Sequence, residues 1–241
     1  MRTRFAHIEE LIAREPCADQ SETGTAGWLA RLCRAAVSEL ASSGVAVSLM
    51  DETGSLGVAA ASDPRSALVV ELQFTLGEGP CVDSFATRRP VLVPDLPGEP
   101  ATRWPAYAGA VEAHGIRAVF AFPLQIGAAR LGVLDVFRDH AGSLTLETLT
   151  QALSFAEVAT KSLLEGQEAA GEGRTPSGLD DVLESRFEVY QAQGMVMIQL
   201  QVGLTQAMSR LRAHAFAHDR PLGDVARDVV ARRLVLQRDS T

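Results

Sequence analysis

The stretch AVFAFPLQIGAARLGVLDVFRD, residues 118–139, contains two apolar runs separated by the tripeptide GAA. The runs cover 118–126 and 130–139, and runs of this kind are typical of strands. A short connection that contains glycine is typical of a tight turn between antiparallel strands. The stretch therefore predicts an antiparallel β-hairpin.

Further strand-like runs precede this hairpin at 45–50, 56–61, 68–74 and 90–96. The sequence DETG predicts a turn between the first two of them. The spacing of apolar residues predicts helices at 4–14, 28–40, 81–88, 101–114 and 145–165. This order predicts an α+β fold, in which an antiparallel sheet is flanked by its first and last helices.

Composition divides the chain into two domains. Residues 166–178, GQEAAGEGRTPSG, are small and polar and predict a linker. Before the linker we expect an N-terminal extension over 1–24 and the α+β domain over 25–165. After it we expect an all-α domain over 179–241.

The net charge of −8 is unevenly distributed along the 241 residues. Between Arg186 and Arg238 there are eight arginines and four carboxylates, a local charge of +4, so the remainder carries −12. An acidic surface repels phosphate, so the whole-chain charge alone disfavours a nucleic-acid partner. The asymmetry instead predicts two domains of opposite electrostatic character.

Several classes of protein are disfavoured by the sequence. Cys17, Cys33 and Cys81 are odd in number and lack CxxC spacing and a nearby histidine, which excludes a disulfide framework and a metal site. The apolar runs are shorter than the ~20 residues of a membrane span, and the N-terminus is too acidic for a targeting peptide. We therefore expect a cytoplasmic protein that does not bind membranes. No Walker or GxGxxG loop is present, so the cofactor is unknown.

An enzymatic function is not predicted. Asp83, Asp95 and Asp135 are acid–base candidates, but no set of nucleophile, base and orienting group accompanies them. We interpret the three as caps, turn residues and solvated strand ends. Cys81 is a possible sensor, because exposed amides at a helix start would lower the pKa of its thiol. The alternative for Cys81 is a small buried side chain.

The segment LGEGPCVDSFATRRPVLVPDL, residues 76–96, followed by the hairpin at 118–139, resembles a GAF domain. The resemblance covers about residues 25–165. It implies a sensor of small molecules or redox signals that also dimerises. The ligand stays open, because the Asn-Lys…Asp pattern of cyclic-nucleotide GAF domains is absent and Val82 stands where bilin-binding members have histidine.

The C-terminal domain begins with a helix expected over 180–201, which contains the segment VYQAQGMVMIQLQ. Two apolar stripes run along this helix, the first through Leu183, Phe187, Tyr190, Gly194 and Met197, the second through Val182, Val189, Val196 and Leu200. One stripe is expected to pack on later helices and the other on a second subunit. We expect Gly203 to end the helix, Thr205 to cap a second and Pro221 to begin a third.

Residues 180–236 strongly resemble an ANTAR domain, the three-helix output domain of bacterial transcription antiterminators. The residues that match the family's pattern are Ala192, Gly194, Met197, Ala207, Leu211, Arg212 and Ala226. The resemblance implies a homodimer that binds paired stem-loops in nascent leader RNA. At Gln193 the chain departs from the pattern, because many members have lysine there, and one phosphate contact is removed.

Two sets of residues follow from this resemblance. The RNA-binding candidates are Arg186, Gln193, Gly194, Arg210, Arg212, His214, Arg220, Arg232 and Arg233. The residues expected in the core or at the dimer contact are Phe187, Tyr190, Ala192, Met197, Ala207, Leu211 and Ala226. Each arginine has the alternative of a solvated ion pair, since Asp224 and Asp228 lie three or four residues from Arg227 and Arg232.

The prediction is a non-enzymatic, one-component regulator in which a signal changes the packing of the helix at 145–165. A DNA-binding regulator that uses the last two helices as a helix-turn-helix is the main alternative. Against it, HAFAHDRPL is a looser connection than the usual short turn. A bundle that serves only as a protein-interaction domain is the third possibility.

Overall fold

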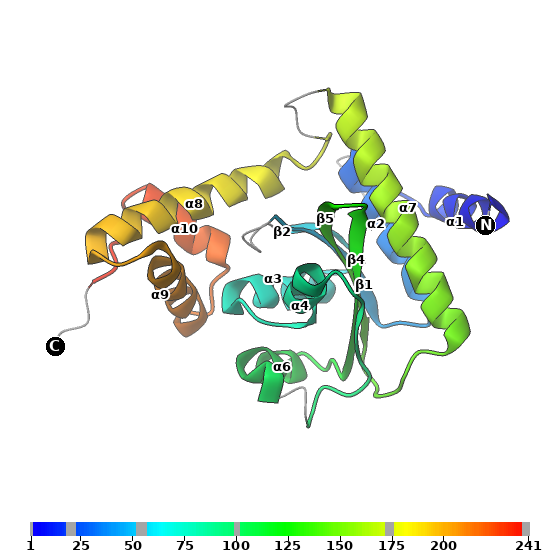
Figure 1. The fold of residues 1–241 in the computed structure, drawn as a ribbon, viewed down its shortest axis with the longest axis horizontal. Coiled ribbons are helices and arrows are strands. Elements are labelled where there is room, and N and C mark those ends of the chain that lie inside the picture. Colours follow the sequence, from blue (N-terminus) through cyan, green and yellow to red (C-terminus); the bar gives the residue numbers. More distant parts are fainter. Residues whose placement is uncertain (1, 18–22, 52–56, 99–101, 172–175, 238–241) are drawn as a thin grey trace.

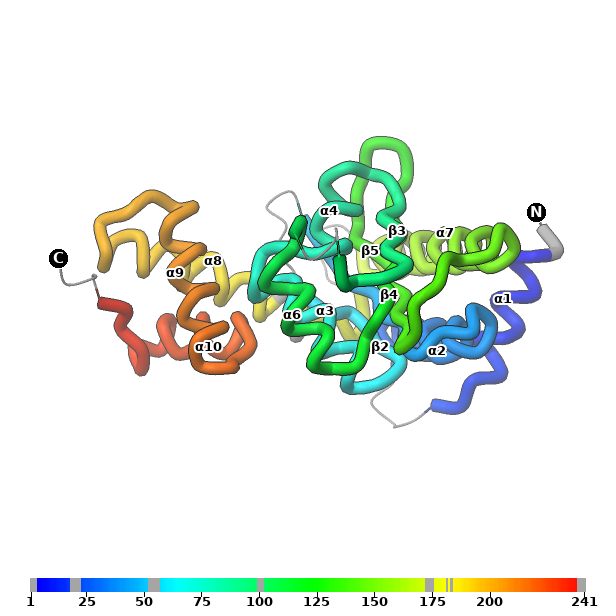
Figure 2. The backbone as a smooth tube through the Cα atoms, turned by 90° about the horizontal axis from the view of Figure 1, so that it is seen from below, coloured from blue at the N-terminus to red at the C-terminus, as the bar shows by residue number. Residues whose placement is uncertain are grey.

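The computed structural model describes residues 2–17, 23–51, 57–98, 102–171 and 176–237. A β-sheet with helices on both faces forms the N-terminal part, and three further helices lie beside it (Figure 1). The turned view shows the same two parts, with the C-terminal helices at one end and the N-terminus at the other (Figure 2). The α+β class and the separate all-α domain are as predicted.

The sheet has five antiparallel strands in the order β2-β1-β5-β4-β3. Their bounds are Gly44–Leu49 (β1), Gly57–Ala61 (β2), Val91–Val93 (β3), Ala118–Ile126 (β4) and Ala129–Arg138 (β5). The predicted hairpin is confirmed: β4 and β5 pair with Phe122 opposite Leu134. Because β5 also pairs with β1, it is the central strand of the sheet.

Each face of the sheet has its own hydrophobic core. One face is covered by α2 (Gly24–Glu39) and α7 (Leu146–Ala170), and α1 (Arg2–Arg14) packs on these two helices. The other is covered by α3 (Pro64–Leu76), α4 (Pro80–Thr87) and α6 (Pro105–Ala113). The expected packing of the first and last helices on the sheet is confirmed by α2 and α7. Helix α7 ends at Ala170, five residues beyond the end of the helix predicted over 145–165.

The strand predicted at 68–74 is wrong, because these residues belong to helix α3. A short apolar run does not distinguish a strand from a buried helix. The ends of the segment decide the matter: Asp63 caps the helix by accepting a 2.9 Å hydrogen bond from the backbone N–H of Ser66, and Pro64 suits the first turn. Gly77 ends it with a left-handed φ of 72°. The predicted turn DETG falls largely on 52–56, outside the described residues.

The C-terminal part is the predicted three-helix bundle of α8 (Asp180–Leu200), α9 (Leu204–Ala217) and α10 (Leu222–Val230), with a core of its own. The predicted cap at Thr205 is wrong. Gly203 occupies the N-cap position of α9, and no side-chain cap is formed there. The expectation that Gly203 ends the preceding helix is also wrong, because α8 ends at Leu200 and Gln201 takes the left-handed C-cap position with a φ of 55°. With Gly203 as the N-cap of α9, Thr205 lies inside the first turn.

The bundle packs against the sheet domain. Helix α8 contacts β2, and helices α9 and α10 contact α3. Both views show α3 on the side of the sheet domain that faces the bundle (Figures 1 and 2). Through this contact, residues that precede position 80 lie next to residues that follow position 180.

The β1–β5 pairing leaves no room for a side chain at Gly132. A Cβ at this position would overlap the backbone carbonyl of Ser48 on β1. We predict that Gly132→Ala lowers the free energy of unfolding by roughly 1–3 kcal/mol, measured by urea denaturation. In Gly109→Ala, where no described atom within 4 Å would meet the new Cβ, the same methyl should stabilise helix α6 by about 1 kcal/mol. Equal midpoints for the two variants would contradict the close strand pairing.

Candidate functional site

A cluster of polar side chains lies inside the sheet domain, between the sheet and the α3, α4 and α6 layer. Asp135 of β5 is at its centre and has 0% exposure. The interpretation of Asp135 as a solvated strand end is wrong, because β5 is central and helices cover both of its faces. Val133 and Phe137, two residues before and after it, lie in the core on this face.

Burial raises the pKa of Asp135 to about 7. The Cys81 thiol and the Gln73 amide lie close enough to oppose this shift. Neither carboxylate oxygen, however, makes a hydrogen bond of ordinary geometry with the described residues. The side chain therefore changes between neutral and charged near neutral pH, inside a core where the charged form is costly.

Cys81 belongs to the same cluster. Its sulfur lies 3.3 Å from the Ser48 hydroxyl and 3.5 Å from the Met50 sulfur, and its backbone N–H donates to Gln73 Oε1 at 2.7 Å. Burial raises the pKa of the thiol well above its ordinary value, and the charge of Asp135 adds to this. The hypothesis of a lowered thiol pKa is therefore contradicted, because complete burial outweighs the helix start.

Two further polar groups of the cluster have no hydrogen-bond partner among the described residues: the hydroxyl of Tyr107 and the amide nitrogen of Gln73. An unsatisfied buried polar group is costly, so a group of them marks a candidate site for a small ligand or ordered water. Sequence analysis did not find Gln73, Tyr107 or Asp135 for this role. The sequence did contain one signal of a buried polar site, since Asp135 is a charged residue in the middle of an apolar strand run.

The other two aspartates have structural partners. Asp83 accepts a hydrogen bond from Trp104 Nε1 at 3.2 Å and pairs with Arg103 at 2.5 Å. Asp95 pairs with Arg117 at 2.9 Å. Both carboxylates therefore fasten loops of the sheet domain.

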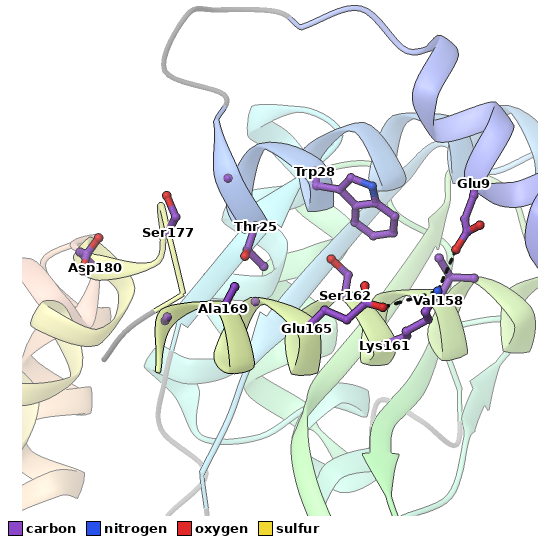
Figure 3. A pocket seen from close by; sticks show the side chains of 13 residues that line it. Glu9, Thr25, Trp28, Val158, Lys161, Ser162, Glu165, Ala169, Ser177 and Asp180 are labelled. Atoms are coloured by element: carbon purple, nitrogen blue, oxygen red, sulfur yellow. Dashed lines mark hydrogen bonds and ion pairs between the residues drawn. The ribbon is translucent and has the colours of Figure 1, made fainter. Parts of the chain in front are cut away.

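A surface hollow of about 1040 Å³ lies where α1, α2 and α7 meet (Figure 3). Trp28 lines it from α2. The ammonium group of Lys161 pairs there with Glu9 at 3.1 Å and with Glu165 at 3.6 Å. Both carboxylates already neutralise this lysine, so it is not available to pair with an anionic ligand.

Three of the RNA-binding or bundle residues proposed from the sequence face the sheet domain. Arg186 pairs with Asp51 at 2.5 Å, and the Tyr190 hydroxyl donates to the same carboxylate. Arg212 donates from Nε to the backbone carbonyl of Phe74 at 3.2 Å. Burial lowers the pKa of Arg212 from its ordinary high value. These contacts form the docking interface between the two domains. The start of α10 also belongs to this interface, because the backbone N–H of Leu222 interacts there with the carboxyl group of Glu71 on α3.

Burial in the docking interface raises the pKa of Glu71 to about 7, and the nearby Asp224 contributes to the shift. The N-terminus of a helix favours a negative charge, which partly offsets this burial. Glu71 is therefore a second group in this protein that titrates near neutral pH.

The other RNA-binding candidates lie on the remainder of the bundle. Arg210, Arg232 and Arg233 are exposed, Gln193 Nε2 donates to the Leu204 carbonyl at 2.9 Å, and the His214 ring stacks on His218 at 4.0 Å. Two further candidates, Arg220 and Arg233, each form an ion pair with Asp228 at 2.7 Å.

Ala192, Ala207, Leu211 and Ala226 are in the bundle core with 0% exposure, and Met197 packs on them. Phe187 is instead 69% exposed on the outer face of α8. Residues spaced by 7 and 11 positions share a helix face, so Gly194 and Ile198 lie on the same side as Phe187. Ile198 is 71% exposed, and no described atom within 4 Å would meet a Cβ at Gly194.

No group of three or more histidine, cysteine or carboxylate side chains within the described ranges is arranged to hold a metal ion. Of the helices in the described part of the chain, none combines the length and apolar character needed to cross a membrane.

Comparison with protein families identifies both domains. The family model of the GAF domain matches residues 26–163, and that of the ANTAR domain matches residues 178–230. A GAF sensor followed by an ANTAR domain is the arrangement of a signal-controlled regulator. The chain belongs to the GAF domain family and carries an ANTAR domain after its sensor. Both resemblances inferred from the sequence are confirmed.

Solved structures agree with the fold of the sensor. The GAF domain of a phosphoenolpyruvate-protein phosphotransferase from Coxiella burnetii aligns with a TM-score of 0.51 at 11% identity, covering 70% of this chain and 95% of that one. The free methionine-R-sulfoxide reductase from Neisseria meningitidis, solved with its substrate, aligns with a TM-score of 0.50 at 18% identity, covering 70% and 90%. At these identities the likeness concerns the fold alone. Comparison with curated proteins gives no match.

The raised pKa of Asp135 predicts how stability depends on pH. The folded state binds the proton up to about pH 7, whereas the unfolded state releases it near the ordinary value of 3.8. Stability from this group is therefore lost as the pH rises from about 4 to 7. We predict that the free energy of unfolding of Asp135→Asn rises relative to that of the parent between about pH 4 and pH 7, by at most roughly 4 kcal/mol. Above about pH 7 the difference between the two proteins should be constant.

Urea denaturation of both proteins at a series of pH values measures this difference. Asp95→Asn, which removes a half-exposed carboxylate of the same domain, is the matched control and should show no such rise. A pH-independent difference for Asp135→Asn would mean that Asp135 is not the titrating group.

Proposed function

We propose that the chain is a cytoplasmic, homodimeric regulator whose ANTAR domain binds stem-loop RNA and promotes transcription antitermination under the control of its GAF domain. The observation that carries this proposal is the position of basic side chains. Arg210, Arg232 and Arg233 are exposed on a folded bundle, at the end of a chain whose net charge is −8. Such a local basic surface attracts phosphate even when the whole chain is acidic.

The type of nucleic acid follows from the ANTAR domain. RNA hairpin loops present unstacked bases and closely spaced phosphates, which arginine side chains engage by charge and by stacking. Two carboxylates of helix α10, Asp224 and Asp228, pair with Arg220, Arg227 and Arg233. These ion pairs leave little continuous basic surface for reading the edges of bases in a DNA groove.

Dimerisation is supported by the outer face of α8. Phe187 and Ile198 are exposed there on both sides of Gly194, and a glycine lets a second backbone approach closely. A dimer presents two bundles at a fixed separation, which favours binding to two hairpins of one transcript over binding to each alone.

Control by the GAF domain is supported by the docking interface. Arg186 and Arg212, two candidates for RNA contact, are engaged by Asp51 and by the Phe74 carbonyl in the docked arrangement. We propose that docking competes with RNA, so that a signal that weakens docking raises the affinity of the ANTAR domain for RNA.

RNA binding predicts a specific loss in a double variant. Arg232→Ala combined with Arg233→Ala should weaken binding to a tandem hexaloop hairpin. A plot of log affinity against log salt concentration should also become less steep, by about 0.7 in slope for each phosphate contact that is lost. Fluorescence anisotropy with labelled RNA at several salt concentrations measures both effects.

The matched control removes two exposed arginines far from the bundle, Arg4→Ala with Arg14→Ala, and should leave the affinity unchanged. Duplex DNA serves as competitor. Parent protein that shows no salt-sensitive RNA binding, or that is displaced better by duplex DNA than by hairpin RNA, would contradict the proposed function.

Docking predicts an effect in the opposite direction. Asp51→Asn keeps the size of the side chain but removes the charge that pairs with Arg186, which should weaken docking by roughly 1 kcal/mol for a partly exposed pair. The affinity of the full-length protein for the hairpin should therefore rise about threefold to tenfold.

Asp95→Asn removes a carboxylate that pairs only within the GAF domain, with Arg117, and should not alter RNA affinity. An unchanged or reduced affinity for Asp51→Asn would refute competition between docking and RNA, even if RNA binding itself is observed.

A further inference from the structure

A cleft of about 430 Å³ lies at the junction of the two domains. Its walls come from the end of β1, the end of α4, the start of β5, the C-terminal half of α7 and the segment that leads into α8. Figure 1 shows α7 on one side of the sheet and α8 extending away from the sheet on the other side. We call this space the junction cleft. Its size is within the range of small-molecule sites.

The charges that line the junction cleft are unbalanced. Three arginines, Arg88, Arg130 and Arg186, line it together with a single carboxylate, that of Asp51. The guanidinium of Arg130 lies 4.8 Å from the ring centroid of Phe85. Within the described residues, neither Arg88 nor Arg130 forms an ion pair with a carboxylate. An excess of positive charge is therefore concentrated in one cleft of an acidic protein.

The one arginine that is paired also retains an unused donor. Arg186 binds Asp51 through Nη2, but its Nε–H is buried and has no hydrogen-bond partner among the described residues. Guanidinium groups donate in pairs to carboxylate or phosphate oxygens, so an unsatisfied donor of this kind favours a further anion nearby.

The remaining walls of the junction cleft are mainly apolar. Met50, Phe85, Leu163 and Leu179 line it and are themselves buried by the surrounding protein. Apolar walls favour a ligand with a hydrocarbon body, because its burial removes apolar surface from water. Together, the arginines and the apolar walls define an amphipathic site, charged at one end.

We infer that the junction cleft binds a small organic anion with an apolar body, whose anionic group is paired by Arg88 and Arg130 beside Arg186. Asp135, Gln73, Cys81 and Tyr107 do not line this site, which borders their buried cluster at Met50. The inference rests on the proposed function for its regulatory consequence but not for the binding itself.

The regulatory consequence follows from the position of the walls. Residues of both domains line the cleft, so a ligand that contacts both binds the docked arrangement more tightly than the undocked one. A ligand shifts an equilibrium toward the state that it binds better. The anion therefore stabilises docking and weakens RNA binding, as a signal that keeps the regulator inactive.

Octanoate tests the binding with the full-length protein, because it combines a carboxylate with a hydrocarbon chain. It should raise the melting temperature and give saturable binding by isothermal titration calorimetry. The matched probes are 1-octanol, which has the same chain without charge, and octylammonium, which has the opposite charge. Neither should raise the melting temperature as octanoate does. An equal effect of 1-octanol would overturn the anion site.

Arg88→Gln and Arg130→Gln should each weaken octanoate binding about tenfold, the size expected from losing one charge-assisted contact. Arg89→Gln is the matched control: it removes the same charge at the neighbouring residue, which does not line the junction cleft. The melting temperature without ligand verifies that each variant is folded. Equal losses in Arg88→Gln and Arg89→Gln would overturn the assignment.

A second measurement tests the regulatory sense. Octanoate should weaken binding of hairpin RNA to the parent protein and have a smaller effect on Arg88→Gln. Stronger RNA binding with octanoate would overturn stabilisation of the docked arrangement. If the protein binds octanoate through these arginines but binds no RNA, the proposed function fails while the junction cleft stands.

Discussion

The rest of the structure depends on the central position of β5, which is paired on both edges and covered on both faces. It joins the predicted hairpin to β1, and at Gly132 a side chain would overlap the backbone carbonyl of Ser48 on β1. Two hydrophobic cores, one on each face, exist because alternate side chains of this strand point into each of them. The same geometry places Asp135 in the interior, where a carboxyl group has no access to water.

The end of β1, next to this central strand, is also where the two domains meet. Asp51 lies two residues beyond the end of β1 and pairs with Arg186 and accepts a hydrogen bond from the Tyr190 hydroxyl, both from α8. One carboxylate thereby links the sheet of the GAF domain to the helix that begins the ANTAR domain. Because the Arg186–Asp51 pair is partly exposed, its net contribution to the free energy of docking is modest. A modest contribution suits a contact that must form and break.

Two chemical environments in the GAF domain are suited to different signals. The cluster around Asp135 is enclosed and holds acceptors and donors without partners, so small changes in occupancy or protonation have large energetic effects there. The junction cleft is more open, positively charged and shared with the ANTAR domain. A change in the cleft acts directly on the docking interface, whereas a change at Asp135 reaches it through neighbours such as Gln73 of α3, a helix that contacts α9 and α10.

Most of the fold could be predicted from local patterns. The hairpin, the flanking helices and the three-helix bundle follow from periodicity and turn residues, because the apolar spacing and the turn residues that mark each element are local in sequence. The segment 68–74 is the exception, because its short apolar run fits a strand or a buried helix equally well. The capping residues Asp63 and Gly77 show that it is a helix. The family of each domain was also predictable, since small, apolar and basic residues occur at characteristic spacings.

The sequence by itself determined the two domains, their families and the basic character of the second. Only the tertiary structure decided which polar residues are buried and which arginines are free to meet a partner. The exposed Arg232 and the docked Arg212 have the same chemistry and lie on the same bundle. They differ only because a domain that is remote in sequence covers one of them. Burial and pairing of this kind depend on contacts between distant segments, and local sequence patterns do not encode such contacts.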